Sequence, residues 1–155
     1  MKSRFILFIT RLALGWVMFY AGITKIMNPN WSAAGYLKNA KTFPEIFNWF
    51  LNPDVLPIVN FINEWGLLFL GVSLILGVGM RISGILGALL MMLYYFPSLD
   101  FPMIGTTSYI VDEHVVYALL LVYLAITESA RYMGLGSWFV RTFASDRPFL
   151  RKLLA

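Results

Sequence analysis

The sequence has 155 residues, of which 59% are hydrophobic and 17% aromatic, and its formal net charge is +4. Only 13% of the residues are charged, about half the share in soluble domains, which excludes an ordinary soluble protein and indicates an integral membrane protein of one domain. The lack of cysteine excludes disulfides, iron–sulfur clusters and thiolate zinc sites, and the single histidine, His114, excludes a bis-histidine haem within one chain, so no metal site is expected.

The first apolar segment runs from about residue 5 to residue 27. As a helix it would be about 34 Å long, enough to cross a hydrocarbon core of about 30 Å. Lys2 and Arg4 precede it as in a signal peptide, but it is too long for one and has no small-x-small cleavage site before Lys25. We therefore interpret it as a retained transmembrane helix that ends at the Asn-Pro-Asn sequence of residues 28–30.

The connection over residues 31–53 is the longest between two apolar segments, and it is too aromatic for a solvated loop. Its aromatic residues are Trp31, Tyr36, Phe43, Phe47, Trp49 and Phe50. Tryptophan and tyrosine concentrate at membrane interfaces. We expect one or two short helices that lie in the outer interface and cover the bundle.

Two apolar segments follow, at about residues 55–79 and 81–96. Asp54 is a candidate N-cap for the first, and Pro57 falls in its first turn, where the missing N–H does no harm. Because only residues 77–80, Gly-Val-Gly-Met, link the two, we predict a tight turn between neighbouring helices. The second of them is expected to stop before the proline at position 97.

A fourth apolar segment covers about residues 111–130, and residues 131–155 mix aromatic residues with arginines. We expect this tail to form a basic amphipathic helix on the inner leaflet. The predicted fold class is therefore all-α. It is a polytopic membrane protein with a bundle of four transmembrane helices and with interfacial helices in the first outer loop.

The basic residues predict the orientation in the membrane. With the N-terminus inside, nine lysines and arginines fall on the inner side, and the three on the outer side are Lys25, Lys38 and Lys41. By the positive-inside rule, we predict a multi-pass protein of the cell membrane with both termini in the cytoplasm. The basic residues stand singly and form no stripe, so the lipid bilayer is an expected partner and nucleic acid is not.

Two opposite charges lie near the inner ends of the first and fourth segments. Leaving one charge unpaired at membrane depth costs about 2.5–3.5 kcal/mol. Arg11 and Glu128 match in depth and differ in sign. We predict that they form a structural ion pair, and a role in substrate binding is the alternative.

A larger group of ionisable and aromatic residues lies near the outer ends. We predict catalytic, proton-exchanging roles for Glu64, His114, Asp112 and Glu113. We predict substrate-binding roles for Lys25, Trp31, Tyr36 and Tyr117. An imidazole exchanges protons near neutral pH. Together with acids, a cation and a phenol, it suits proton exchange with a redox carrier dissolved in the membrane.

A structural interpretation of the same group stays open. Asp112 would cap the fourth helix, and His114 would hydrogen-bond a loop carbonyl. Lys25 would extend to the interface or pair with Glu64. On this interpretation the outer group holds the bundle together and binds no substrate.

Three stretches of the sequence carry a family resemblance. The first is RLALGWVMFYAGITK over residues 11–25, followed by NPNWSAAGYL over residues 28–37. The others are EWGLLFLGVSLILGVGMR over residues 64–81 and VDEHVVYAL over residues 111–119. Together they resemble the DoxX/DoxD membrane proteins, and the third resembles the fourth helix of the DoxD-like branch.

The resemblance implies a four-helix membrane bundle. For the DoxD branch it implies the membrane subunit of a thiosulfate:quinone oxidoreductase, which oxidises thiosulfate to tetrathionate and passes the electrons to quinone. It also implies a second, DoxA-like subunit, which would come from another polypeptide. Quinone would then be a diffusible acceptor, and no covalent cofactor is expected.

The alternative function is a non-catalytic membrane scaffold or partner-binding subunit of a larger complex. Arg11, Gly15, Met18, Gly22 and Lys25 share one face of the first helix. Glycines on such a face let another backbone approach closely. That backbone would belong to a neighbouring helix, to a partner protein or to a second copy in a homo-oligomer. A carrier has less support, because the sequence has neither internal symmetry nor a pair of broken helices.

Overall fold

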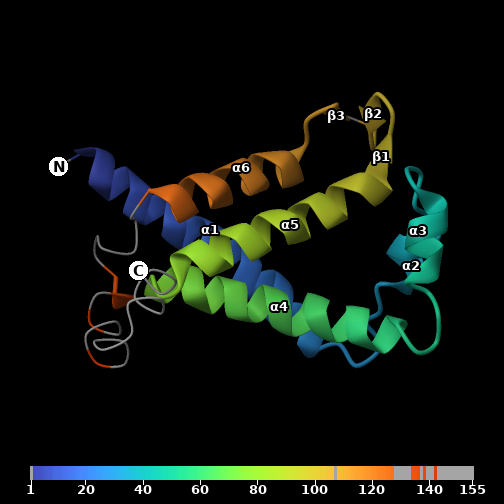
Figure 1. Ribbon diagram of the computed structural model, residues 1–155, viewed down its shortest axis with the longest axis horizontal. Helices are drawn as coiled ribbons and strands as arrows, with labels where there is room; N and C mark the ends of the chain where they lie inside the picture. Colours follow the sequence, from blue (N-terminus) through green and yellow to red (C-terminus); the bar gives the residue numbers. More distant parts are fainter. Residues whose placement is uncertain (1, 107, 128–133, 137, 139–141, 143–155) are drawn as a thin grey trace.

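The computed structural model describes residues 2–106, 108–127, 134–136, 138 and 142 (Figure 1). Three of its helices are long and apolar enough to cross a membrane: α1 (Lys2–Ile26), α4 (Leu56–Leu76) and α5 (Met80–Ser98). The chain is therefore an all-α polytopic membrane protein, as predicted.

Helix α6 (Glu113–Ile126) is apolar but has 14 residues. At 1.5 Å per residue it is about 21 Å long, which is shorter than the hydrocarbon core. The predicted fourth segment extended to residue 130, and residues 128–130 lie outside the described part of the chain. The count of four membrane spans thus stays a prediction.

The aromatic connection contains two short helices, α2 (Ala34–Lys38) and α3 (Pro44–Trp49), which confirms that part of the prediction. We call residues 31–53 the cover segment. Leu37 and Phe47 are buried with Ala33 in a small apolar core, against which Trp31 and other partly buried residues pack. The cover segment thus has its own packing interactions and lies across one end of the bundle (Figure 1).

Three two-residue strands lie between α5 and α6, a stretch for which we made no prediction. They are β1 (Leu99–Asp100), β2 (Met103–Ile104) and β3 (Ser108–Tyr109). All are paired antiparallel in the order β1-β2-β3. So short a sheet leaves too few alternating side chains to be recognised from sequence.

Two predicted helix ends were wrong. Val55, not Asp54, is the N-cap of α4, and it makes no side-chain cap bond, although Pro57 does lie in the first turn. Helix α5 continues through Pro97 to Ser98. The proline is tolerated because the helix ends one residue later, so its missing N–H affects only the last turn.

The bundle consists of two helix pairs. Helix α1 packs along α4, and α5 packs along α6, whereas α4 and α5 share few contacts and diverge away from their common turn (Figure 1). Glycines bring the backbones together in both pairs. A Cβ on Gly71 would lie 2.3 Å from the Phe19 backbone nitrogen, and a Cβ on Gly84 would lie 2.6 Å from the Leu121 carbonyl oxygen. These contacts leave no room for a Cβ, and close backbone approach of this kind favours helix association in a membrane.

We call the end that holds the link between α4 and α5 the turn end. The predicted tight turn is confirmed, with Gly77 at φ 70° and Gly79 at φ 68°. The hydroxyl groups of Ser73 and Ser83 lie 2.5 Å apart and join α4 to α5. At this end the two helices are in direct contact.

Arg11 lies at the turn end and is fully buried. Its guanidinium lies against Gly77, where a Cβ would be 2.6 Å from Nη1. The predicted partner, Glu128, is outside the described residues, so the ion pair stays a prediction. Most of the predicted tail, residues 131–155, is outside them too, but the Leu135 N–H donates to the Leu76 carbonyl over 2.9 Å.

Candidate functional site

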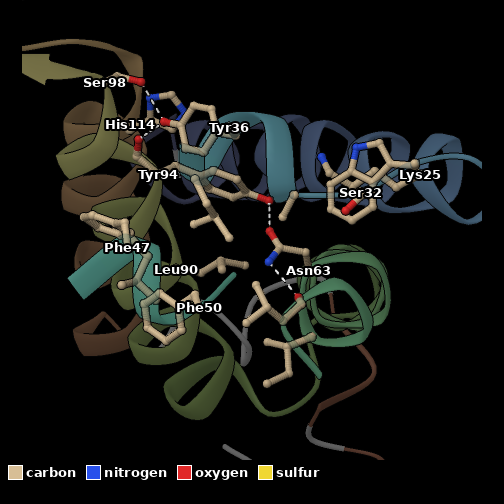
Figure 2. A pocket seen from close by; sticks show the side chains of 16 residues that line it. Lys25, Ser32, Tyr36, Phe47, Phe50, Asn63, Leu90, Tyr94, Ser98 and His114 are labelled. Carbon is tan, nitrogen blue, oxygen red and sulfur yellow. Dashed lines mark hydrogen bonds between the residues drawn. The ribbon is translucent and has the colours of Figure 1, made fainter. Parts of the chain in front are cut away.

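A cavity of about 380 Å³ lies at the opposite end of the bundle, between α4 and α5 and beneath the cover segment (Figure 2). We call this the cavity end. Aromatic and aliphatic side chains from α4, α5 and the cover segment make up most of its wall. The polar side chains that line it are those of Lys25, Ser32, Tyr36, Asn63, Tyr94, Ser98 and His114. The cavity is thus mostly apolar, with a few polar groups, as is typical of small-molecule sites.

Lys25, in the last turn of α1, places its ammonium group against two aromatic rings. The Nζ atom is 5.1 Å from the ring centre of Trp31 and 5.8 Å from that of Tyr94. Both distances are in the range of cation–π attraction. Within the described part of the chain no salt bridge joins Lys25 to Glu64, although the charge of Glu64 acts on the ammonium from a greater distance.

His114 is held by Asp112 at the start of α6. Asp112 is the N-cap residue, and its carboxylate accepts the backbone N–H groups of His114 at 3.0 Å and Val115 at 3.2 Å. The other carboxylate oxygen is 2.6 Å from Nδ1 of His114. Because a carboxylate only accepts, Nδ1 carries a hydrogen and the neutral ring presents Nε2 as an acceptor. No described residue hydrogen-bonds to Nε2.

Tyr94 lies between these two groups on α5. Its ring centre is 5.7 Å from that of His114 and 6.0 Å from that of Tyr36, and the Lys25 ammonium also lies against it. The Tyr94 hydroxyl donates to Oδ1 of Asn63 on α4, and the Asn63 amide donates to the Val59 carbonyl over 2.8 Å (Figure 2). This hydrogen-bonded chain orients the Tyr94 ring and connects α4 to α5 across the cavity.

Hydrogen bonds at the N-cap residue and at the middle of α2 hold this helix over the cavity. At its start, Asn60 of α4 accepts the Ala33 N–H over 2.9 Å. Farther along, the Tyr36 hydroxyl donates to the backbone carbonyl of Tyr94 and lies 2.6 Å from the Ser98 hydroxyl. The cover segment is therefore bonded to both α4 and α5.

The phenol of Tyr36 stays protonated well above neutral pH. Burial raises its pKa above the ordinary value, the hydrogen bond with Ser98 acts in the opposite direction, and the charge of Asp112 raises it further. A protonated phenol is required for donation to the Tyr94 carbonyl. This contact therefore persists through the physiological pH range.

The structure brings together half of the predicted site residues. Lys25, Trp31, Tyr36 and His114 line one cavity. Asp112 contacts the imidazole of His114 from behind and also caps α6, as the structural interpretation predicted.

The other predicted site residues do not line this cavity. Glu64 directs its backbone carbonyl toward Gly22 of α1. Glu113 is exposed and Tyr117 is one turn farther along α6. Their predicted roles stay predictions, and Glu64 is linked to the cavity only through the electrostatic effect of its charge on Lys25.

Sequence reasoning missed Asn63 and Tyr94, which form the link across the cavity. A signal for them was present. Asn60 and Asn63 are two amides one turn apart near the start of an apolar helix, where unpartnered amides are costly. Nothing in the sequence showed that Asn63, rather than its neighbour Glu64, faces α5.

Metal binding has no support at this site. Within residues 2–106, 108–127 and the short described pieces that follow, no group of three or more histidine, aspartate or glutamate side chains could hold a metal ion.

Residues 6–99 match the family model described as DoxX. The match covers more than half of the chain and includes every residue that lines the cavity except His114. No curated protein and no solved structure matches the sequence.

Proposed function

The chain belongs to the DoxX family of membrane proteins, and from that premise we propose that it is the membrane subunit of a quinone-linked oxidoreductase. The proposed binding site for the quinone ring is the cavity between α4 and α5. The family is often linked to oxidoreductase functions, which supports a redox role over a carrier.

One observation carries the proposal. A cation and a carboxylate-backed imidazole lie against the same ring, Tyr94, inside one largely apolar cavity. A quinone ring is flat and apolar, and it has two carbonyl oxygens that accept hydrogen bonds. Tyr94 and Trp31 supply aromatic surface for such a ring, and the Lys25 ammonium supplies a donor.

When bound, a quinone supplies an acceptor for two electrons, and its reduction consumes two protons. Once protonated at Nε2, the His114 imidazolium would donate one of these protons to the bound ring and return to the neutral form. Asp112 would stabilise the imidazolium before the transfer and would keep the imidazole oriented. The second proton would come from water. Asp112 is thus proposed as a positioning residue and His114 as a proton donor.

We place the electron donor outside this cavity. Its aromatic and aliphatic walls suit a ring better than a small, strongly hydrated dianion such as thiosulfate. The donor, thiosulfate in the DoxD-like case, would be oxidised on or beside a second, DoxA-like subunit. This assignment rests on the resemblance and on the chemistry of the walls.

The test measures quinone binding to the protein purified in mild detergent. Lys25→Gln and His114→Ala should each weaken binding of a benzoquinone about tenfold, since each removes a polar contact to the ring. Lys38→Gln is the matched control, because Lys38 is exposed on α2 and does not line the cavity. Quinone reduction is then assayed in membranes that contain the protein, with thiosulfate added as the electron donor together with any neighbouring soluble subunit.

Failure of the wild-type protein to bind quinone would reject the proposal. If the folded Lys25→Gln and His114→Ala variants bind quinone as tightly as the wild-type protein, the cavity is not the binding site. Either result would favour the scaffold alternative, in which the same charges only stabilise the bundle.

A further inference from the structure

We infer that the ligand of the cavity is an amphiphile dissolved in the membrane, whose apolar tail leaves sideways between α4 and α5 past Ile62 and Leu93. The inference rests on the proposed function, because it takes the cavity as the site of the ring. It adds the route by which the ligand enters and the requirement for a tail.

Matching triplets from α4 and α5 line the facing walls of the cavity. Each has the i, i+3, i+4 spacing of one helix face. They are Val59, Ile62 and Asn63 on α4, and Leu90, Leu93 and Tyr94 on α5. The two helices therefore face one another across the cavity.

The middle residue of each triplet is the most exposed one. Ile62 is 53% exposed and Leu93 is 51% exposed, whereas the others are partly buried. Both middle residues continue rows of exposed apolar side chains, with Ile58 one turn earlier on α4 and Leu89 one turn earlier on α5. In a membrane-spanning helix such a row faces lipid. The edge of the cavity at Ile62 and Leu93 therefore lies on the lipid-facing side of the bundle.

Among the described residues, the two at this edge are held by no side-chain hydrogen bond. Neither Ile62 nor Leu93 has a side-chain hydrogen-bonding group, and the Asn63–Tyr94 bond that joins the two helices lies beside them. The direct helix contact through Ser73 and Ser83 is far along the bundle, at the turn end. Moving two aliphatic side chains breaks no hydrogen bond.

The cover segment, in contrast, closes the end of the cavity with hydrogen bonds. Asn60 holds the Ala33 N–H, and Tyr36 bonds to both Tyr94 and Ser98. Entry from the aqueous side would break these bonds. The lateral route has the smaller barrier, and it is open only to a molecule that partitions into lipid.

The experiment compares two ligands on the full-length protein in lipid nanodiscs. One is a benzoquinone with a decyl chain, and the other is the same ring without the chain. Ile62→Trp and Leu93→Trp add bulk at the lateral edge. Ile58→Trp and Leu89→Trp are matched controls, because both residues are similarly exposed on the same helices and do not line the cavity.

We expect Ile62→Trp and Leu93→Trp to weaken binding of the chain-bearing quinone about tenfold and to leave binding of the bare ring nearly unchanged. The control variants should bind both ligands as wild type does. Equal weakening for both ligands, or none, would overturn the lateral route and leave the quinone site standing. If the wild-type protein binds neither ligand, the proposed function fails together with the route.

Discussion

The two ends of the bundle use the same helices to opposite effect. At the turn end, glycines and serines let α4 and α5 touch, and a fully buried arginine lies against the turn. At the cavity end, the same two helices carry Asn63, Leu90 and Tyr94, which are too large for backbone contact, and a cavity of about 380 Å³ remains.

Side-chain size changes along α4 and α5, so that one end of this helix pair is suited to stability and the other end to binding. Small residues allow close backbone packing, which favours helix association in a membrane. Larger residues keep the helices apart, so the polar groups among them must be satisfied by one another or by a ligand. We therefore expect variants at the turn end and along the helix pairs to affect folding, and variants at the cavity end to affect binding.

The largest expected effect is a difference in cysteine labelling between the two ends of the bundle, which shows which end faces the outside of the cell. If the cavity end is outside, single cysteines at Asn52 or Thr106 should react with an impermeant thiol reagent in intact cells, and a cysteine at Ser3 should react only after permeabilisation. The chain has no other cysteine, so each signal has one source. Labelling of Ser3→Cys in intact cells would mean that the turn end, and not the cavity end, faces outward.

The next effect tests the close packing of α1 against α4. Gly71→Ala should lower the free energy of unfolding by about 3 kcal/mol, because its Cβ would strike the Phe19 backbone, which cannot move as a side chain does. Gly66→Ala on the same helix is the control, since the nearest atom to its Cβ would be 3.9 Å away. Thermal unfolding in detergent measures both, and equal losses would mean that glycine contacts do not determine this helix pair.

A third prediction separates the two roles of Asp112. Asp112→Asn keeps an N-cap residue, so the stability should change little, but the carboxylate behind His114 is lost and quinone turnover should fall about 10- to 100-fold. Asp112→Ala should lose turnover to a similar degree and about 1 kcal/mol of stability as well. Activity of Asp112→Asn equal to that of wild type would remove Asp112 from the proton-exchanging site.

A fourth prediction concerns the link across the cavity. Tyr94→Phe keeps the ring but removes the hydrogen bond to Asn63, and it should cost about 1–2 kcal/mol because a partly buried amide oxygen loses its partner. Asn63→Leu should cost a similar amount. Since both substitutions break one interaction, the double variant should lose less than the two single losses together. Additive losses in unfolding experiments would show that the link contributes no stability.

The smallest effect concerns the cover segment. Burial raises the pKa of Tyr36, so its contact with Tyr94 and Ser98 should be constant from pH 6 to 9 and should weaken only as the pH rises past the ordinary phenol value of about 10. The rate of thiol labelling at Leu37→Cys, a buried position of α2 on the cavity wall, measures this when it is divided by the rate at the exposed position Lys38→Cys, because thiolate formation alone raises both rates with pH. Tyr36→Phe should raise this ratio a few-fold at every pH. A ratio that climbs between pH 6 and 9 with Tyr36 in place would contradict the assignment.

The sequence by itself determined the class of protein and most of its helices. A low share of charged residues and long apolar segments are properties of composition and local order, and they need no knowledge of the fold. The tight turn at Gly77 and Gly79, the position of Pro57 and the short helices of the cover segment followed from local geometry. The gathering of Lys25, Trp31, Tyr36 and His114 also followed, because each lies near the same end of a helix or in the segment that joins two of them.

Only the tertiary structure decided which helices pair and which side of each helix faces the cavity. One residue along a helix is a rotation of about 100°, so Asn63 and Glu64 point in different directions. The sequence could not say which of them faces α5. That direction depends on how Gly71 and Gly22 bring α4 against α1, which is a contact between residues far apart in the chain. Pairing of α1 with α4 and of α5 with α6 leaves α4 and α5 apart at one end, and this separation creates the cavity.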